Sequence, residues 1–282
     1  MTKGYVSSSF RPKINNVYPP FNITLFEEHF FETFESQRLE LDREYIPVFW
    51  TGLYVNRSYG HGDLSDVQAY LDSLDRSKKY FTVVQYDDNI LNDLKDLDVL
   101  IFAQGGHGKY KELCYPIPLN CMPSPHANTS VSKDIFCNFI GAIKGRHRIR
   151  EKLQDILQGN KKYLVSETMG YGPFHDAMNR SLFSLCPRGY GQTSFRICEA
   201  LQHGSIPVYV YDEALVPFSD MHKFEDYGVL VHESDISRID DILSSIDYSR
   251  YMDMVDAGKK AYTQLYSYDG CFNSVIRKLK SA

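Results

Sequence analysis

No apolar run in this sequence approaches the ~18 residues that a membrane-spanning helix needs. The N-terminal twenty residues carry Lys3, Arg11 and Lys13 but no hydrophobic segment after them, so a secretory signal peptide is not expected. The six cysteines form no CxxC pair and no cluster with histidine, which is typical of reduced thiols. We therefore expect a cytoplasmic protein with no membrane partner.

A surplus of basic residues is also lacking. Lys and Arg number 31 against 36 Asp and Glu, a net charge of −5, so we expect no nucleic-acid partner. Tryptophan occurs once, whereas tyrosine occurs 21 times. Tyrosine combines a flat apolar face with a polar tip, which suits carbohydrate or nucleotide surfaces, although compositional drift would give the same count.

The length of 282 residues suggests about two domains, and no internal repeat or low-complexity tract is present. Apolar runs alternate with segments of helical spacing, which predicts α/β units with parallel sheets. In the first half we expect helices at 23–41 and 66–74, and strands at 45–50, 81–86, 98–103 and 115–119. In the second half we expect strands at 135–142, 181–186, 206–211 and 228–232, and helices at 146–157, 172–180, 194–203, 236–243 and 251–280.

Residues 120–134 contain proline, serine and asparagine and are expected to form a long loop. This loop separates the two alternating series. We therefore expect an α/β domain at 1–134 and a second at 135–262, followed by a C-terminal helix at 263–282 that packs back toward the first domain.

The most informative segment is 181–208, which is predicted to form a strand, a glycine-rich turn, a helix and another strand. Thr193 and Ser194 are good N-cap residues for that helix. Gly189 and Gly191 allow the backbone to approach a ligand closely. The free N–H groups of a first helical turn, together with the helix dipole, form an anion site.

Two arginines flank this helix start. Arg188 precedes the helix and Arg196 lies in its first turn, and guanidinium groups give bidentate hydrogen bonds to a diphosphate. Glu199, about one turn further on, is placed to accept hydrogen bonds from two ribose hydroxyls. The alternative is that the segment is an ordinary α/β turn in which Arg196 pairs with Glu199 on a solvated face.

The order of these residues resembles a known family. The combination of Pro187-Arg188-Gly189, Ser194-Phe195-Arg196, Glu199-Ala200-Leu201-Gln202 and Ile206-Pro207-Val208 is similar to the signature of exostosin-type inverting glycosyltransferases. The resemblance extends upstream through Phe139–Ala142 and Arg146…Arg150, and downstream through 215–218, 224–229 and 233–236. It covers about 135–275 and is weaker in the first half, at 81–88 and 115–118.

The resemblance implies a GT-B fold, in which two Rossmann-like α/β domains face each other across a cleft. It implies that the second half binds a UDP-sugar and the first half a glycan acceptor. Family members usually carry an N-terminal Golgi anchor, which we do not expect here. The short chain is similar to exostosin-like xylosyltransferases of large algal viruses, which makes xylose the expected sugar. Galactose, arabinose and uronic acids stay open.

Sugar transfer requires stabilisation of the negative charge that develops on the leaving diphosphate. Arg146 and Arg150 share one helix face and are expected to contribute, although they belong to a basic run that is also consistent with a solvated stripe. The complete expected donor site is Arg146, Arg150, Arg188, Gly189, Tyr190, Thr193, Ser194, Phe195, Arg196 and Glu199.

The acceptor hydroxyl must also lose a proton to a base. Candidates are residues of the first half that follow strands, where α/β sites form. Asp87 and Asp88 follow the strand at 81–86, and the family has an acidic residue in a similar place. Asp63, after the first strand, and His107, after the third, are the other candidates. Each could instead be a turn-forming or solvent-exposed residue.

We expect no metal ion and no other cofactor. Asp96-Leu97-Asp98 is formally a D-x-D motif, but it precedes its strand and lies in the acceptor half. A nucleotide-sugar epimerase would show G-x-G-x-x-G after the first strand, which is absent here. A non-catalytic sugar- or nucleotide-binding protein with the same fold stays open as an alternative.

Overall fold

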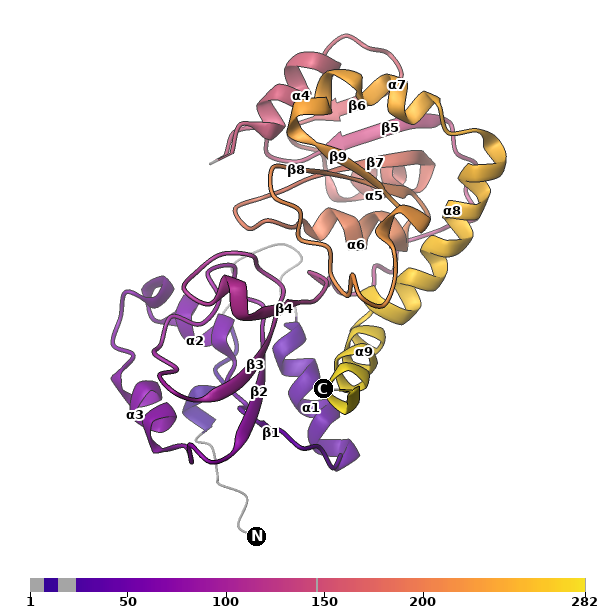
Figure 1. Ribbon diagram of the computed structural model, residues 1–282. Helices are drawn as coiled ribbons and strands as arrows, with labels where there is room; N and C mark the ends of the chain where they lie inside the picture. Colours follow the sequence, from indigo (N-terminus) through magenta and orange to yellow (C-terminus); the bar gives the residue numbers. More distant parts are fainter. Residues whose placement is uncertain (1–7, 15–23, 146, 282) are drawn as a thin grey trace. The chain divides into compact units, whose positions relative to one another are not determined.

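The computed structural model describes residues 8–14, 24–145 and 147–281 (Figure 1). The chain divides into two compact units. One unit runs up to Ile117 and includes the chain from Phe272 onward, and the other comprises Pro118–Cys271. Within the described residues, no helix combines the length and apolar character that crossing a bilayer requires.

The first unit is built on a four-stranded parallel sheet with the order β1-β2-β3-β4. Its strands are β1 (Glu44–Tyr45), β2 (Lys79–Val84), β3 (Asp98–Ala103) and β4 (Cys114–Pro116). The helices are α1 (Phe26–Gln37), α2 (Trp50–Asn56) and α3 (Ser65–Ser73), with 3-10 turns at Ser8–Phe10, Ser58–Gly60 and Lys111–Leu113. The predicted strands at 81–86 and 98–103 and the predicted helices are confirmed, with small shifts of their ends.

The strand predicted at 45–50 is wrong over most of its length. Only Glu44 and Tyr45 pair with β2, and Trp50 already begins α2. Pro47 has no N–H to donate, so it cannot continue the ladder. The Trp50 indole is buried and donates to Thr82 Oγ1 at 2.8 Å, so the apolar run is buried as a loop and helix start.

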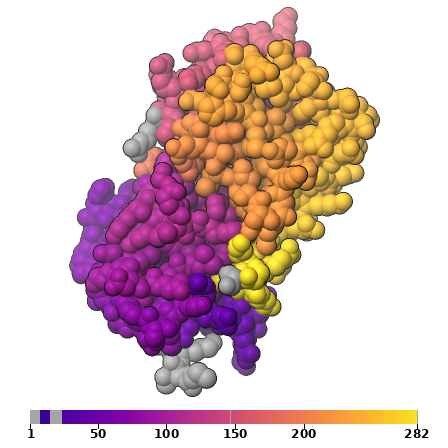
Figure 2. Space-filling model, in the orientation of Figure 1, coloured from indigo at the N-terminus to yellow at the C-terminus, as the bar shows by residue number. Residues whose placement is uncertain are grey.

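Aromatic rings fill one side of this unit. The Phe30 ring on α1 lies 6.1 Å from Phe81 on β2 and 5.0 Å from Phe272, which belongs to the same unit. The space-filling view shows C-terminal residues, in yellow, beside the indigo and magenta residues of this unit (Figure 2). The opposite side of the sheet is covered by buried residues of α2 and α3, including Leu53 and Val67.

A buried carboxylate joins three elements of the first unit. Glu27 on α1 accepts hydrogen bonds from Gln85 N at 2.7 Å, Thr51 Oγ1 at 2.8 Å and Thr51 N at 3.0 Å. Thr51 lies in the first turn of α2, where backbone N–H groups have no helical acceptor. Glu27 thus fixes the start of α2 beside the residue that follows β2. Burial raises the pKa of Glu27 to about 7.

We predict that Glu27 makes the protein less stable as the pH rises from about 4.5 to 7. In that window the unfolded chain releases the proton while the folded protein keeps it, so the free energy of unfolding falls as pH increases, by up to about 3 kcal/mol. The Glu27→Gln variant should show a flatter dependence in urea titrations across this range. Glu32→Gln, an exposed change on the same helix, should keep the wild-type slope; equal slopes for Glu27→Gln and wild type would contradict the assignment.

The second unit is built on a five-stranded parallel sheet with the order β6-β5-β7-β8-β9. Its strands are β5 (Ile135–Ile140), β6 (Tyr163–Ser166), β7 (Ser181–Pro187), β8 (Ile206–Tyr211) and β9 (Val229–His232). The helices are α4 (Ile149–Leu157), α5 (Tyr171–Arg180), α6 (Phe195–Gln202), α7 (Ile239–Ser244) and α8 (Tyr248–Ala261). Helix α9 (Tyr268–Ser281) begins in this unit, and from Phe272 onward it belongs to the first unit. Short 3-10 turns lie at Phe224–Asp226 and Glu233–Arg238.

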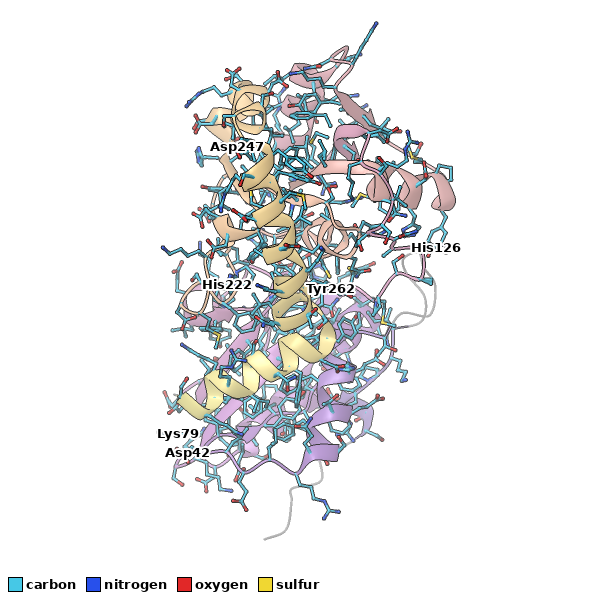
Figure 3. All side chains as sticks on the ribbon, turned by 90° about the vertical axis from the view of Figure 1, so that its right-hand side faces the viewer. Asp42, Lys79, His126, His222, Asp247 and Tyr262 are labelled. Atoms are coloured by element: carbon cyan, nitrogen blue, oxygen red, sulfur yellow. The ribbon has the colours of Figure 1, made fainter. Side chains whose placement is uncertain are left out.

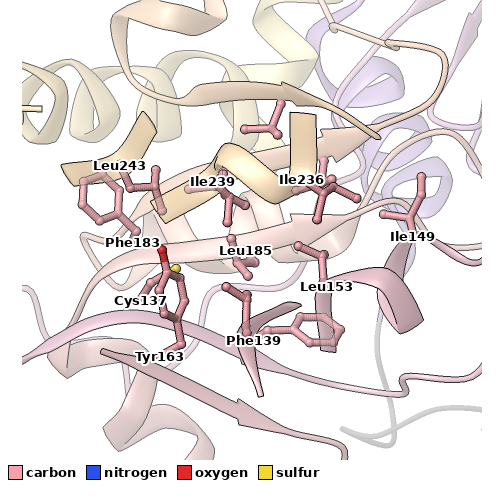
Figure 4. Packing of buried hydrophobic residues seen from close by; sticks show 14 of the residues in the cluster. Cys137, Phe139, Ile149, Leu153, Tyr163, Phe183, Leu185, Ile236, Ile239 and Leu243 are labelled. Atoms are coloured by element: carbon pink, nitrogen blue, oxygen red, sulfur yellow. The ribbon is translucent and has the colours of Figure 1, made fainter. Parts of the chain in front are cut away.

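Apolar side chains from the strands and helices form the core of this unit (Figure 4). Leu153 on α4 and Ile239 on α7 pack into the cluster that contains Phe139 and Leu185 on the central strands. This packing fixes the carboxyl ends of β5 and β7, where loops of an α/β sheet form binding sites.

Two features of the second unit differ from the sequence prediction. Strand β6 was not expected, because it has four residues, three of them half-buried, and follows Lys161 and Lys162. The helix expected throughout 251–280 is interrupted. A π-helical turn at Tyr262–Tyr266 ends at Ser267, which is extended at φ −67° and ψ 156°. Figure 3 labels Asp247, the N-cap of α8, and Tyr262 at the start of this turn.

Residues 118–134 belong to the second unit, whereas the sequence placed the boundary after 134. Hydrogen bonds explain this: Ser124 N donates to Gln202 Oε1 at 2.7 Å, and Asn128 N donates to Asn179 Oδ1 at 2.9 Å. The expectation of two Rossmann-like α/β domains is confirmed, since each unit contains a parallel sheet with helices. The expected arrangement across a cleft stays a prediction.

Candidate functional site

The glycine-rich turn between β7 and α6 forms the centre of the candidate site. Gly189 N donates to Thr193 O at 3.2 Å, which closes the turn. Ser194 is the N-cap of α6, and its hydroxyl oxygen accepts a hydrogen bond from Arg196 N at 3.3 Å. The predicted strand, turn and helix are therefore confirmed. The helix N-terminus lies at the carboxyl end of the sheet, where its dipole favours an anion.

The Arg188 side chain holds this turn in place. It is 3% exposed and donates to Asp212 Oδ1 at 2.5 Å, beyond the end of β8. It also donates to Gly191 O and Tyr190 O, both at 3.2 Å. These contacts tie the glycine-rich turn to the segment after β8. Arg188 therefore lies beside the start of α6, as expected, and its side chain fixes the conformation of the glycine-rich turn.

We predict that Asp212→Ala destabilises the protein, because it leaves the buried Arg188 guanidinium without its carboxylate. Asp212 is 29% exposed, so we expect a loss of about 2 kcal/mol, below the roughly 3–5 kcal/mol typical of breaking a fully buried pair. Denaturant unfolding provides the measurement. Asp235→Ala, which removes the partner of the exposed Arg238, should change stability by less than about 0.5 kcal/mol. Equal losses in the two variants would argue against the structural role of Asp212.

Arg150 and Arg196 converge on the carboxyl end of β5. Arg196 Nη2 donates to Ile140 O at 2.6 Å, and Arg150 Nη1 donates to Ala142 O at 3.0 Å. Arg150 Nε also donates to Arg188 O at 3.2 Å, which links α4 to the glycine-rich turn. Burial lowers the pKa of Arg150, and the nearby Arg196 charge lowers it further. Two neighbouring guanidinium groups that repel each other in this way would be stabilised by an anion between them.

Glycines line the space beside these two arginines. A Cβ atom on Gly141 would lie 3.8 Å from Arg196 Nη2, and a Cβ atom on Gly189 would lie 3.5 Å from Arg150 Nη2. At both positions the glycine has no side chain, so only its main-chain atoms lie beside the guanidinium group. This arrangement allows a ligand to approach the backbone and the arginines together.

Arg196 and Glu199 form the ion pair that the sequence analysis considered, with Nε and Oε2 3.2 Å apart. Their side chains are 16% and 31% exposed, so the pair lies on a half-buried face and not on a fully solvated one. The Arg196 guanidinium also lies 4.6 Å from the centre of the Phe174 ring, within cation–π range. These contacts fix the carboxylate and the guanidinium relative to each other.

A pair of buried histidines supports the end of α6. The Nδ1 of His203 donates to Glu199 O at 2.8 Å, so its Nε2 accepts from His175 Nδ1 at 2.9 Å. Burial lowers the pKa of His203 to about 4, so this imidazole is neutral at physiological pH. The sequence did not predict a role for Phe174, His175 or His203. His203 lies one helical turn beyond Glu199, but Phe174 and His175 come from α5, and nothing in their spacing along the chain relates them to Glu199.

The remaining predicted residues of this unit are distributed around the turn. Thr193 is buried, whereas the side chains of Tyr190 and Phe195 are exposed. Arg146 lies outside the described residues. The structure thus brings Arg150, Arg188, Arg196 and Glu199 together with the glycine-rich turn, and their roles as ligands stay predictions.

In the first unit, the loops after β2 and β3 pack against each other. His107 N donates to Asp87 O at 3.2 Å. A Cβ atom on Gly105 would come 2.5 Å from Asp87 Cα, and one on Gly108 would overlap Asp88 O. Three of the four candidate bases, Asp87, Asp88 and His107, therefore lie in one loop pair at the carboxyl ends of neighbouring strands. Their catalytic role stays a prediction.

Asp63 has a different setting. Its Oδ1 accepts a hydrogen bond from Ser65 N at 2.8 Å at the start of α3, and hydrogen bonds from Ser65 lower the pKa of Asp63. This exposed carboxylate stabilises a helix start and is held in its ionised form.

The D-x-D motif lies at the amino end of a strand, as the sequence predicts. Asp98 is the first residue of β3, and Oδ1 of Asp98 pairs with Arg43 Nη1 at 2.7 Å. Among the residues that the structure describes, no group of three or more His, Cys, Asp or Glu side chains is placed to hold a metal ion.

Comparisons with known proteins agree with the motifs. Residues 84–246 match the exostosin GT47 domain, which is more than half of the chain. The chain therefore belongs to the exostosin GT47 family.

Curated relatives carry glycosyltransferase names. A protein of Oryza sativa subsp. japonica named "Probable glucuronosyltransferase" is 42% identical over 97 residues, which are 34% of this chain and 22% of that protein. An Arabidopsis thaliana protein named "Probable beta-1,4-xylosyltransferase" is 42% identical over 73 residues, or 26% of this chain and 18% of its own length. The matched part is thus less than a quarter of each relative.

Among solved structures, an α-glucosyltransferase bound to UDP and a 13-mer DNA is similar, with a TM-score of 0.45 and 12% identity. The match covers 76% of this chain and 75% of that protein.

Proposed function

We propose that this protein is an inverting glycosyltransferase that transfers a sugar from a UDP-sugar to a hydroxyl group of a glycan acceptor without a metal ion. The observation that supports this most directly is the convergence of Arg150 and Arg196 beside the capped N-terminus of α6. Membership in the exostosin GT47 family agrees with it.

The second unit would bind the donor. Negative charge develops on the diphosphate as the glycosidic bond breaks, and fixed donors stabilise this charge where it forms. Arg150, Arg196 and the first N–H groups of α6 would provide those donors. Their guanidinium groups are already held by main-chain carbonyls, so they need little reorganisation. Arg188 would contribute through the shape of the turn, and the fixed arginines would take the place of a metal ion.

Glu199 would bind the ribose. Its carboxylate is oriented by Arg196 at 3.2 Å and is one-third exposed, so it keeps the capacity to accept hydrogen bonds from two hydroxyls. The exposed rings of Tyr190 and Phe195 border the same turn and offer flat surfaces for a base or sugar.

The first unit would supply the base. Inversion requires a group that takes the proton of the acceptor hydroxyl on the face opposite the leaving group. We favour Asp87 or Asp88, which follow β2 and share their loop pair with His107. Asp63 is less suitable, since hydrogen bonds from Ser65 already hold its carboxylate at a helix start.

Xylose is the sugar we propose. One similar plant protein is named as a probable beta-1,4-xylosyltransferase, which supports this choice. Relatives named as glucuronosyltransferases favour a uronic acid as the second candidate. A non-catalytic nucleotide-binding protein is the alternative from another class, and release of sugar from the donor by the purified protein would exclude it.

We predict that Arg196→Ala, Arg150→Ala and Glu199→Ala each weaken UDP binding about tenfold or more, because each removes a charged hydrogen-bonding group worth roughly 1.5–3 kcal/mol. Isothermal titration with UDP provides the measurement. UDP should bind, GDP should not, and EDTA should leave UDP affinity unchanged.

Arg148→Ala is the matched control for this series, since Arg148 is 81% exposed and pairs with Glu151 on the same helix turn. Its UDP affinity should stay within about twofold of wild type. Wild-type affinity in Arg150→Ala, Arg196→Ala and Glu199→Ala alike would refute the donor site.

We also predict that either Asp87→Asn or Asp88→Asn lowers kcat by about 10²-fold or more while UDP affinity stays unchanged, because loss of a general base affects the chemical step. Transfer assays with UDP-xylose and a xylan oligosaccharide measure kcat. Asp63→Asn should retain activity near the wild-type level. Full activity in both Asp87→Asn and Asp88→Asn would rule out this loop as the source of the base.

A further inference from the structure

Two thiols that are far apart in the sequence meet beside α6. Cys121 lies in the segment that leads into the second unit, and Cys198 lies on α6. The backbone N of Cys121 is 3.4 Å from the Sγ of Cys198. Gln202 Nε2 donates to Cys121 Sγ at 3.1 Å and lies 3.8 Å from Cys198 Sγ. One amide group therefore reaches both sulfur atoms.

This spacing places the Cys121 backbone close to the Cys198 sulfur atom. An N–Cα bond of about 1.46 Å places the Cys121 Cα within about 4.9 Å of Cys198 Sγ. A rotation of the Cys121 side chain would carry its sulfur atom toward Cys198 Sγ, and a disulfide requires the two Cα atoms to lie roughly 4.4–6.8 Å apart. Both residues belong to the second unit, so the bond requires no movement between units.

The two thiols differ in access. Cys121 is half-buried, whereas Cys198 is fully buried. An oxidant in solution therefore meets Cys121 first, and Cys198 can react only with a sulfur atom already attached to Cys121.

We propose that Cys121 and Cys198 form a reversible disulfide in the folded protein, which makes α6 sensitive to oxidation. This inference goes beyond the proposed glycosyl transfer and does not depend on it. The bond would join the segment at 118–134 to the helix that carries the half-buried pair of Arg196 and Glu199.

Oxidised glutathione is a sufficient oxidant. The Cys121 thiolate attacks the glutathione disulfide, which gives a mixed disulfide at Cys121 and releases one glutathione thiolate. The Cys198 thiolate then attacks the Cys121 sulfur and releases the second glutathione. The two protein thiols lose two protons and two electrons in all, and one molecule of oxidised glutathione becomes two molecules of the reduced form.

The attack of Cys121 on oxidised glutathione should be slow at neutral pH. The neighbouring Cys198 thiol and burial both raise the pKa of Cys121 well above its usual value. The Glu199 carboxylate acts in the same direction, and the Arg196 charge opposes it. Since the thiolate is the attacking species, the rate should increase as the pH rises.

The test is oxidation of the full folded chain with oxidised glutathione at about pH 8.5, followed by alkylation and mass spectrometry. In the wild type we expect a loss of ~2 Da, protection of two thiols from alkylation and a linked peptide pair that contains Cys121 and Cys198. Reduction with dithiothreitol should restore both thiols. Cys198→Ser should instead keep a stable glutathione adduct on Cys121, and Cys121→Ser should leave Cys198 reduced.

Cys137 and Cys186 provide the matched control. They lie on the neighbouring strands β5 and β7, and both are fully buried. Cys137→Ser should leave the 121–198 bond intact.

A wild-type protein that accumulates the glutathione adduct on Cys121 without the linked peptide would overturn the proposal. A link that forms only after unfolding in urea would also overturn it. Neither result depends on UDP binding or sugar transfer, so failure of the disulfide and failure of the proposed function are distinguishable.

Discussion

The buried charge of Arg188 is the constraint on which the candidate site depends. An unpaired guanidinium in this position would be costly, so Asp212 and the carbonyl oxygens of Tyr190 and Gly191 must surround it. Those contacts determine the path of the glycine-rich turn. The conformation of this glycine-rich turn then determines where α6 begins and where its free N–H groups point. A residue that the sequence presents as a ligand therefore acts first on the protein's own main chain.

The position of Arg188 also determines where Arg150 lies. The carbonyl oxygen of Arg188 accepts a hydrogen bond from Arg150, so the turn also positions the arginine of α4. Arg196 is held from the other side by Ile140 O and by Glu199. The result is a cationic group of three arginines on different elements, each bonded to the main chain. Because these side chains are already oriented, binding of an anion would cost little reorganisation energy.

The sequence predicted much of this arrangement. The alternation of apolar runs and helices identified both sheets, and the spacing of Ser194, Arg196 and Glu199 identified the helix start. It could not show that Arg188 is buried against Asp212 or that His203 pairs with His175, because these contacts join residues that are distant in sequence. The prediction of a strand at 45–50 was wrong because a continuous apolar run indicates that a segment is buried, but it does not show that the segment forms hydrogen bonds with a neighbouring strand. Strand β6 was missed because it is a short edge strand beside two lysines.

The bare main chain at Gly141 and Gly189 has a further consequence for selectivity. A binding surface made of peptide groups and guanidinium forks recognises oxygen atoms by charge and direction, and it carries no shape that distinguishes one nucleotide from another. If the site binds a nucleotide as proposed, discrimination between bases would arise at its edge, where the rings of Tyr190 and Phe195 face solvent. Exchange of these peripheral aromatic residues would then alter the preferred donor while the cationic centre stays unchanged.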